Sequence, residues 1–458
     1  MDRAPLHVLI KPIFQVHSMP KTQRAAATRT KSPDVDPVLA SLLKVKETTL
    51  KNGLKVRLLP DRSAPVVSLY LFYKVGARNE RPGITGISHL FEHMMFNGAK
   101  KYGPKQFDRV LESRGGRSNA YTSNDLTVYH EDFAADALAT VLDLESDRMR
   151  SLTISDASLA SEREVVKEER RLRVDNDIVG LMDEELNPLV YRAHPYRWPV
   201  IGWMADIENI TREDCEAYFR TYYAPNNAHL YLAGDFDPKE ALAMVEKAFG
   251  NIRPGPAPLA VIDAEPPQKG ERRAVVHHPA QAPSLMLGYR GPAAREEDTL
   301  VLDVLQYILT VGEGSRLTRS LVYEQELAVS AGMDWTWRFD PGMLLFLVEL
   351  KPDGDPARVE AALLEQLAAV VKDGVSAREL RKAKNNLPAH LLRELSTNGG
   401  RAHALGQYEL FFGSWKKGLS LPAAYERITA KQVQEAAARY LRPELRSVVT
   451  LVPTAQAA

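Results

Sequence analysis

An internal repeat with an offset of 218 residues is the feature that most constrains the fold of this chain. Each copy has an isoleucine–threonine pair, a tyrosine and a proline at matching spacings, namely Ile210, Thr211, Tyr222 and Pro225, then Ile428, Thr429, Tyr440 and Pro443. Threonine is a favoured helix cap, proline cannot continue a helix, and an apolar segment typical of a strand follows each copy. Because the match contains no gap, we predict two duplicated halves.

The segment between the two copies, Gly250 to Gly270, is rich in proline and is predicted to be a linker. A chain of 458 residues is also too long for one ordinary domain. We therefore predict a first domain over residues 41–250, a linker over 251–270 and a second domain over 271–458.

The first 40 residues form a basic segment whose role the sequence leaves open. Lys11 and Pro12 interrupt its apolar stretch, which makes it a poor secretory signal. A degenerate signal, an amino-terminal arm and a start codon assigned too early all fit this composition.

The composition is that of a globular protein and argues against several classes of partner. Lys plus Arg and Asp plus Glu both number 59, so no net field favours nucleic acid or an anionic membrane. No apolar run approaches the ~18 residues that a membrane span requires. The single cysteine, Cys215, excludes an internal disulfide framework.

A metal site is indicated by the run His89-Leu90-Phe91-Glu92-His93. Residues three and four apart share one face of a helix, so both histidines would lie one turn apart with Glu92 beside them. Two imidazoles at this spacing can bind one zinc ion, and the carboxylate can take a proton from a water molecule at the metal. The alternative is two histidines hydrogen-bonded to carbonyl groups. The apolar neighbours favour the metal, because they predict a helix buried nearly all round, where polar groups need a partner.

A third protein ligand is expected on the predicted helix from Asp156 to Arg173. At about 100° per residue, its buried stripe is predicted to comprise four apolar residues, Leu159, Val165, Val166 and Leu172. Glu162 and Glu169 fall within this stripe, whereas Glu164 and Glu168 fall outside it among basic residues. Buried carboxylates are usually paired or bound to a metal, so the first two are the candidates.

These motifs resemble those of the M16 (pitrilysin-like, insulinase) zinc peptidases, and most closely the short bacterial and mitochondrial-processing-peptidase-like members. The resemblance rests on GISHLFEHMMFNG and SEREVVKEERR and extends from about Val45 to Pro453. It implies an α+β fold of two homologous halves, each a mostly antiparallel sheet with helices packed on it. The two halves together would form half of a clamshell chamber.

The resemblance also implies roles for individual residues. His89, His93 and Glu169 match the zinc ligands, Glu92 matches the general base, and Glu162 matches a glutamate that supports the ligands from behind. The resemblance further implies that Asn119, Ala120, Tyr121 and Thr122 lie on an edge strand, where a peptide substrate adds as an extra β-strand. An ordinary hairpin strand is the alternative for this segment.

The second half is predicted to carry no metal. Its expected helix from Asp298 to Leu317 has an apolar period but no histidine, and His277 and His278 are interpreted as surface or structural residues. Relatives carry an arginine and a tyrosine that stabilise the oxyanion, whereas the aligned positions here hold Val322 and Val329. Either the chain is weakly active alone, or a zinc-less homologous partner subunit supplies the pair. We favour the partner.

The sequence thus predicts a zinc metalloendopeptidase, with one zinc ion per chain, that is the catalytic subunit of a heterodimer. It would hydrolyse peptides or unfolded segments held in an enclosed chamber. A non-catalytic scaffold or assembly subunit is the alternative, but such chains usually lose ligands that this one retains. A zinc hydrolase acting on other substrates is compatible with the ligands, although the edge strand argues against it. Resemblance to bacterial members implies the periplasm, with the cytoplasm as the alternative.

Overall fold

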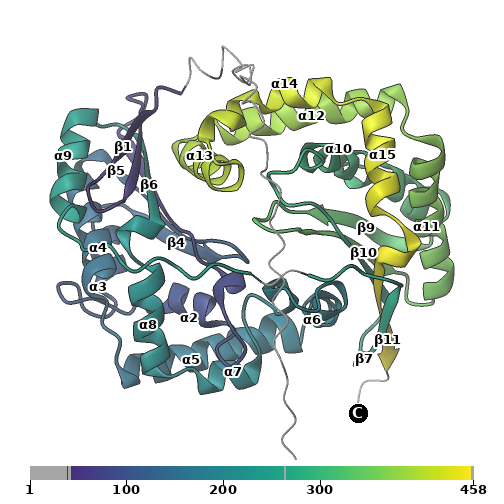
Figure 1. Cartoon of the computed structure of the whole chain (residues 1–458), viewed down its shortest axis with the longest axis horizontal. Coiled ribbons are helices and arrows are strands. Elements are labelled where there is room, and N and C mark those ends of the chain that lie inside the picture. The colour runs from purple at the N-terminus through teal and green to yellow at the C-terminus, as the bar shows by residue number, and fades with distance from the viewer. Residues whose placement is uncertain (1–38, 40–42, 263–264, 455–458) are drawn as a thin grey trace, which may run out of the picture. The chain divides into compact units, whose positions relative to one another are not determined.

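The computed structural model describes Leu39, residues 43–262 and residues 265–454, and Figure 1 shows how the elements are arranged. The basic segment over the first 40 residues, for which an arm or a signal was expected, lies outside the described residues except for Leu39. Within the part of the chain that the structure describes, no helix is long and apolar enough to cross a membrane.

The first half is built on a six-stranded sheet with the strand order β1-β2-β6-β3-β5-β4. Its strands are β1 (Lys46–Thr49), β2 (Lys55–Pro60), β3 (Val66–Tyr73), β4 (Arg117–Thr122), β5 (Thr127–Ala134) and β6 (Ala228–Gly234). Strands β2 and β6 run parallel, and the other neighbouring pairs are antiparallel. Strand β6 is buried along its whole length, as expected for a central strand. Strand β4 lies at the sheet edge, so one side of its backbone can pair with another strand.

The second half repeats this topology in a five-stranded sheet with the order β7-β11-β8-β10-β9. Its strands are β7 (Arg272–Pro279), β8 (Ser284–Arg290), β9 (Ala328–Trp335), β10 (Met343–Leu350) and β11 (Arg446–Thr454). Strand β7 is parallel to β11, as β2 is to β6. Helices α8 (Arg212–Tyr222) and α15 (Ala430–Tyr440) are offset by 218 residues and are capped by Thr211 and Thr429. The predicted α+β fold with two homologous halves is confirmed.

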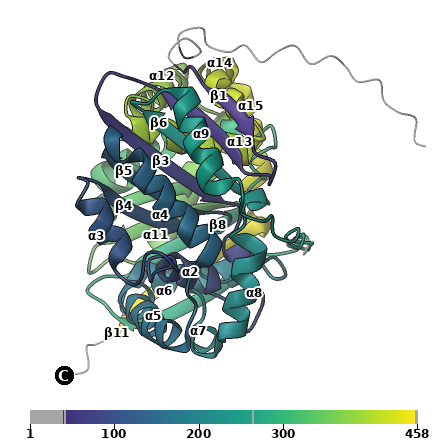
Figure 2. The same cartoon turned by 90° about the vertical axis from the view of Figure 1, so that its left-hand side faces the viewer.

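The remaining helices lie between these strands in the chain, and Figure 2 shows α4 and α9 crossing one face of the first sheet. Those of the first half are α2 (Ile87–Met94), α3 (Gln106–Glu112), α4 (Leu138–Ser151), α5 (Asp156–Arg170), α6 (Ile178–Val190), α7 (Met204–Asn209) and α9 (Pro238–Phe249). Those of the second half are α10 (Thr299–Thr310), α11 (Pro356–Asp373), α12 (Ala377–Glu394), α13 (Asn398–Phe412) and α14 (Leu421–Arg427). A π-helical segment, Arg171–Asp175, continues α5.

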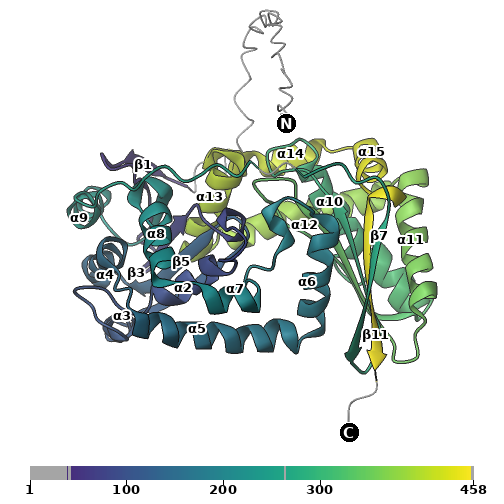
Figure 3. The same cartoon turned by 60° about the horizontal axis from the view of Figure 1, so that its bottom comes forward.

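Each half contributes a helix to the sheet of the other half. Helix α13 packs on β3 and β6 of the first sheet, and α6 packs on β7, β8 and β11 of the second (Figures 1 and 3). A glycine stands at each crossing: a Cβ atom on Gly406 of α13 would lie 2.3 Å from the Phe72 ring, and one on Gly288 of β8 would lie 2.8 Å from Val190 of α6. This close approach permits the two halves to share core packing.

A buried ion pair fixes α13 on the first sheet. Arg57 of β2 donates to Glu409 of α13 from Nε at 2.9 Å and from Nη2 at 2.6 Å. The hydroxyl of Tyr231 on β6 donates to the same carboxylate at 2.9 Å. Arg57 and Glu409 are 7% and 8% exposed, so removal of either charge would leave the other buried without its partner.

We expect Glu409→Gln to lower the free energy of unfolding by roughly 3 kcal/mol, because the buried Arg57 guanidinium loses its bidentate partner and keeps only the half-exposed Glu47 carboxylate, at 3.6 Å. Urea unfolding followed by circular dichroism measures the change. The matched control is Glu324→Gln, whose partner Arg319 lies at 3.2 Å with both side chains more than half exposed. That control should cost less than ~0.5 kcal/mol. Equal effects of the two substitutions would contradict the role given to the buried pair.

The core of the second half contains a buried carboxyl group, Asp303 of α10, that is 7% exposed. It accepts hydrogen bonds from the Tyr425 hydroxyl at 2.7 Å and from the Trp337 indole N–H at 3.1 Å. Among the described residues no cationic side chain forms an ion pair with it. Burial raises the pKa of Asp303 from its ordinary value of 3.8 to about 7, although the hydrogen bonds oppose this.

Asp303 should make the protein less stable as the pH rises from about 4 to about 7. In this window the folded chain holds a proton on Asp303 that the unfolded chain has lost, so each rise in pH favours the unfolded state. We expect Asp303→Asn to lose less unfolding free energy than the wild type between about pH 5 and pH 7. Urea unfolding at a series of pH values measures this, and parallel curves for the two proteins would show that Asp303 does not titrate there.

Candidate active site

The helix that carries both histidines, α2, is anchored at its amino end by a buried carboxylate. Glu80 accepts hydrogen bonds from the backbone N–H groups of Gly86 and Ser88, each at 2.8 Å. The Ser88 hydroxyl lies 2.6 Å from the hydroxyl of Tyr218 on α8. Burial raises the pKa of Glu80 to about 8. The residue after Ser88 is the first histidine, so these contacts fix the start of its helix face. Glu80 belongs to no sequence pattern and was not predicted.

Both histidines of α2 lie beside Glu169 of α5. Their ring centroids are 4.9 Å apart. The Oε2 atom of Glu169 lies 3.6 Å from Nε2 of His89 and 3.2 Å from Nε2 of His93. One possible ligand atom from each of the three residues lies within 4.8 Å of the others. The other sides of α2 are buried, as its apolar residues predicted.

The buried stripe of α5 is narrower than the sequence indicated. Leu159 and Val166 are buried, but Val165 is 47% exposed and Leu172 is 71% exposed, so the prediction for these two residues was wrong. The stripe continues instead to Arg170, which donates to the Gly202 carbonyl at 3.0 Å. The helix packs on α2 and α7, and Arg170 at its end also contacts Glu184 of α6. Its two inward glutamates lie at the flank of this stripe, and Leu172 lies in the π-helical segment, where the helical period changes.

Charge is concentrated around His93, which lies between two carboxylates. Its Nδ1 atom is 3.5 Å from Oε2 of Glu162, while Nε2 faces Glu169. Burial lowers the pKa of His93, but the two carboxylates outweigh this and raise it to about 9. Burial and the neighbouring His93 lower the pKa of His89 to about 4. Contact with His93 lowers the pKa of Glu169, whose other oxygen lies 3.0 Å from Arg173 Nε. The surroundings of His93 therefore favour a positive charge, whereas those of His89 favour the neutral imidazole.

This donor set fits a zinc ion. Two imidazoles and one carboxylate are typical of catalytic zinc sites with three protein ligands. The carboxylates around His93 attract positive charge, and His89 contributes a neutral ring. The Nδ1 atom of His89 is buried and has no hydrogen-bond partner among the described residues, so this imidazole is not committed to a hydrogen-bond network.

Glu92 lies on the same helix and contacts the end of strand β4. The Thr122 hydroxyl donates a hydrogen bond to Oε2 of Glu92 at 2.7 Å. Burial raises the pKa of Glu92, and the hydrogen bond from Thr122 opposes this rise. A carboxylate with a raised pKa is a stronger base, which suits it to accept a proton during a reaction.

The other expected substrate-binding residues lie along the free edge of β4. The Asn119 side chain accepts a hydrogen bond from the backbone N–H of Ala120 at 2.8 Å. The Tyr121 hydroxyl lies 2.9 Å from Nε2 of His403 and accepts a hydrogen bond from Gln407 at 2.9 Å, both on α13. His403 and Gln407 were not predicted, because nothing in the local sequence pattern indicates that α13 packs against the first sheet.

The second half has no comparable cluster of metal-ligating groups among the described residues. His277 is exposed and His278 is half-buried on β7. Val322 packs against the core of the second half, and Val329 on the edge strand β9 is 60% exposed. Neither valine side chain can donate a hydrogen bond to a substrate.

Comparisons with known proteins point to one peptidase family along most of the chain. The family profile described as Insulinase (Peptidase family M16) matches residues 55–202, and the profile described as Peptidase M16 inactive domain matches residues 209–387. The chain is 33% identical over 374 residues to "Zinc protease PqqE" of Helicobacter pylori (strain ATCC 700392 / 26695), covering 80% of this chain and 84% of the relative.

Two solved structures extend the likeness to the fold. The crystal structure of a protease from Helicobacter pylori has a TM-score of 0.87 and 30% identity, with 90% of this chain and 100% of that chain covered. The periplasmic protease PqqL from Escherichia coli has a TM-score of 0.73 at 22% identity, and the match covers 90% of this chain but 48% of that one. The sequence matches to both profiles and to the first relative show that the chain belongs to the M16 peptidase family.

Proposed function

We propose that this chain is a zinc-dependent metalloendopeptidase in which His89, His93 and Glu169 bind the metal and Glu92 is the general base. The observation that carries the proposal is the convergence of both histidine Nε2 atoms on one Glu169 oxygen beside Glu92. Family membership supports the same chemistry, and a relative is named a zinc protease.

The reaction proposed is the hydrolysis of a peptide bond. A bound zinc ion would polarise water and the scissile carbonyl group. The Glu92 carboxylate accepts a proton from the attacking water and returns it to the leaving amine. The Thr122 hydroxyl holds one Glu92 oxygen and so orients the carboxylate for both transfers. Glu162 faces Nδ1 of His93 and would orient that ring, as carboxylates behind metal-bound histidines do.

The substrate would bind as an additional strand on the free edge of β4. Main-chain hydrogen bonds to an edge strand give affinity, and pockets for alternate side chains give selectivity. The Ala120 N–H is satisfied by the Asn119 side chain, so a peptide carbonyl would replace that side-chain oxygen. This exchange exposes the polar Asn119 amide without leaving the edge N–H group unpaired.

We also propose that the active enzyme contains a homologous zinc-less partner subunit. The support is the pair Val322 and Val329, which lack the hydrogen-bond donors that stabilise an oxyanion. The PqqL chain is about twice as long as the segment this chain matches, so a second chain would supply a comparable length. A periplasmic location is proposed from the same relative, whose title calls it periplasmic.

Substitution Glu169→Gln should lower the bound zinc well below one ion per chain, because the amide is a weaker metal ligand than the carboxylate. Zinc content after gel filtration, measured by plasma mass spectrometry, tests this. Glu168→Gln is the matched control, since that neighbouring side chain is 69% exposed and points away from the histidines. Full zinc occupancy in Glu169→Gln would mean that the third ligand is another residue.

Substitution Glu92→Gln should retain the wild-type zinc content and lower peptide turnover by at least ~10²-fold, because the amide cannot accept the proton. The measurement is hydrolysis of a mixed quenched-fluorescent peptide library, with Glu112→Gln on the exposed side of α3 as the control. Wild-type turnover in Glu92→Gln would refute the role of this base.

The same peptide library tests the need for a partner subunit. If the purified wild-type chain cleaves these peptides alone, the need for a partner subunit is refuted, while zinc binding without cleavage supports it.

A further inference from the structure

Residues 336–342 of the second half, which join β9 to β10, contact the first half at the turn that follows strand β4. We propose that this contact positions the end of β4 for the reaction, with Asp125 and Asp340 as positioning residues. The end of β4 carries Thr122, whose hydroxyl holds the carboxylate of Glu92. The inference rests on the proposed peptidase function and gives the second half a part in the chemistry of the first.

Asp125 lies in the turn between β4 and β5 and is 2% exposed. Its Oδ2 atom accepts a hydrogen bond from the backbone N–H of Phe339 in the second half, at 3.0 Å. Its Oδ1 atom accepts one from the Tyr196 hydroxyl at 2.7 Å and lies 3.3 Å from Nε of Arg78. Three separate segments of the chain therefore hold one buried carboxylate, and the turn cannot shift without breaking a hydrogen bond to it.

Arg78 extends this network to a second carboxylate, Asp340, which lies in the second half. The Nε atom of Arg78 donates to Oδ2 of Asp340 at 3.0 Å, and Nη2 contacts the same oxygen. Nε2 of His194 lies 3.0 Å from that oxygen, and the backbone N–H of Asp340 donates to the Tyr196 hydroxyl at 3.2 Å. The Arg78 side chain is 16% exposed, so salt screens its ion pairs less than those on an open surface.

The network also borders the start of α2, the helix that carries both histidines. Arg78 lies two residues before Glu80, whose carboxylate accepts the first N–H groups of that helix. The backbone N–H of Arg78 donates to the Asn124 carbonyl at 2.8 Å. A Cβ atom on Gly76 would lie 2.4 Å from the Ser123 carbonyl oxygen, so the two backbone segments are in close contact. One cluster thus joins the end of the proposed substrate strand to the anchor of α2.

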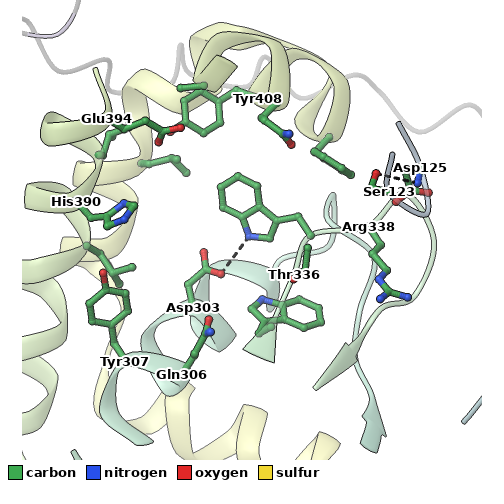
Figure 4. Close-up of a pocket in the computed structure, with 18 of the residues that line it drawn as sticks. Ser123, Asp125, Asp303, Gln306, Tyr307, Thr336, Arg338, His390, Glu394 and Tyr408 are labelled. Carbon is green, nitrogen blue, oxygen red and sulfur yellow. Dashed lines mark hydrogen bonds between the residues drawn. The ribbon is translucent and has the colours of Figure 1, made fainter. Parts of the chain in front are cut away.

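Apolar packing does not enclose the turn after β4, because a cavity of about 750 Å³ lies beside it between the two halves. Ser123, Asn124 and Asp125 line this cavity from the first half, and Trp337 and Arg338 line it from the second (Figure 4). A segment beside open space gains fewer packing contacts than one inside a core. Directional polar contacts, of which those of Asp125 are the most buried, therefore determine where the turn lies.

A purely structural role for the cluster is the competing explanation. A cluster that only adds stability would change zinc content and turnover together, because both follow the folded fraction. Ala120 in the middle of β4 is also held through its neighbour Tyr121, which contacts α13, whereas Thr122 adjoins the turn. A loosened turn should therefore disturb the orientation of Glu92 more than the pairing of a peptide with β4. The expected result is a fall in kcat with little change in KM.

The test uses the full chain, purified with added zinc, in three variants. Asp125→Asn replaces one acceptor oxygen by an NH₂ group that faces a donor, and Asp340→Asn removes the charge that holds Arg78 from the second half. The control is Asp353→Asn, an exposed residue in the turn after β10. Hydrogen exchange read by mass spectrometry follows residues 119–126. Hydrolysis of neutral quenched-fluorescent peptides, with candidate partners where the chain needs one, gives kcat and KM.

We expect Asp125→Asn to speed exchange in residues 119–126 and to lower kcat, each by about tenfold, with KM changed by less than about threefold. Asp340→Asn should change exchange and kcat in the same directions by roughly threefold, since Arg78 keeps Asp125. Zinc content should stay at the wild-type value, and Asp353→Asn should match the wild type throughout.

Unchanged exchange in residues 119–126 after both substitutions overturns the proposal. Loss of zinc together with faster exchange throughout the first half also overturns it, because that result shows a structural role. If Asp125→Asn does not fold, Asp340→Asn alone decides between these outcomes.

The outcome is separable from that of the proposed peptidase activity, because hydrogen exchange requires no turnover. If the wild-type chain hydrolyses no peptide with any candidate partner while exchange changes as expected, the peptidase is overturned and the coupling between the halves stands. If peptides are hydrolysed and both variants keep the wild-type kcat, the positioning role is overturned and the peptidase stands.

Discussion

Helix α13 lies on the sheet of the half to which it does not belong, and the geometry of the candidate site depends on that packing. Apolar contacts alone would let a helix slide along a sheet, since burial has no direction. The bidentate pair between Arg57 and Glu409 does have a direction, and the missing side chain of Gly406 fixes how closely the helix approaches Phe72. With α13 fixed, the hydrogen bonds between Tyr121 and the side chains of His403 and Gln407 on that helix fix the edge strand beside the cluster of His89, His93 and Glu169.

The two halves show how one topology carries two kinds of polar chemistry. In the first half, α2 presents two imidazoles to carboxylates of α5, and the group favours positive charge. In the second half, α10 buries a single carboxyl, Asp303, among neutral donors from Tyr425 and Trp337. The strand order is shared, so the fold positions the helices but does not determine the chemistry. The choice is made by a few side chains on the helix faces.

The sequence predicted those elements whose pattern is local and periodic. Helical spacing was sufficient to place His89 and His93 on one face and to select Glu162 and Glu169 over their exposed neighbours. Helical spacing did not predict that Val165 is exposed, because the width of a buried stripe depends on what packs against the helix.

Contacts between distant segments could not be predicted in this way. Glu80 is a single carboxylate in a turn, and only the fold places it under the first N–H groups of α2. Arg338 lies in a loop of the second half, and only the fold places its guanidinium over the Tyr196 ring of the first half. The internal repeat predicted two homologous halves, but a repeat carries no information about which helix crosses to the other sheet.

The energetics of the edge strand limit how much selectivity the proposed strand pairing can give. An exposed strand edge is an aggregation hazard, and here the Asn119 side chain already satisfies the Ala120 N–H. A bound peptide therefore exchanges one hydrogen bond for another, and the net gain per bond is only about 1 kcal/mol or less. Burial of an aromatic side chain is worth about 2 kcal/mol or more. In the proposed function, burial of peptide side chains would therefore discriminate among substrates more strongly than the strand pairing does.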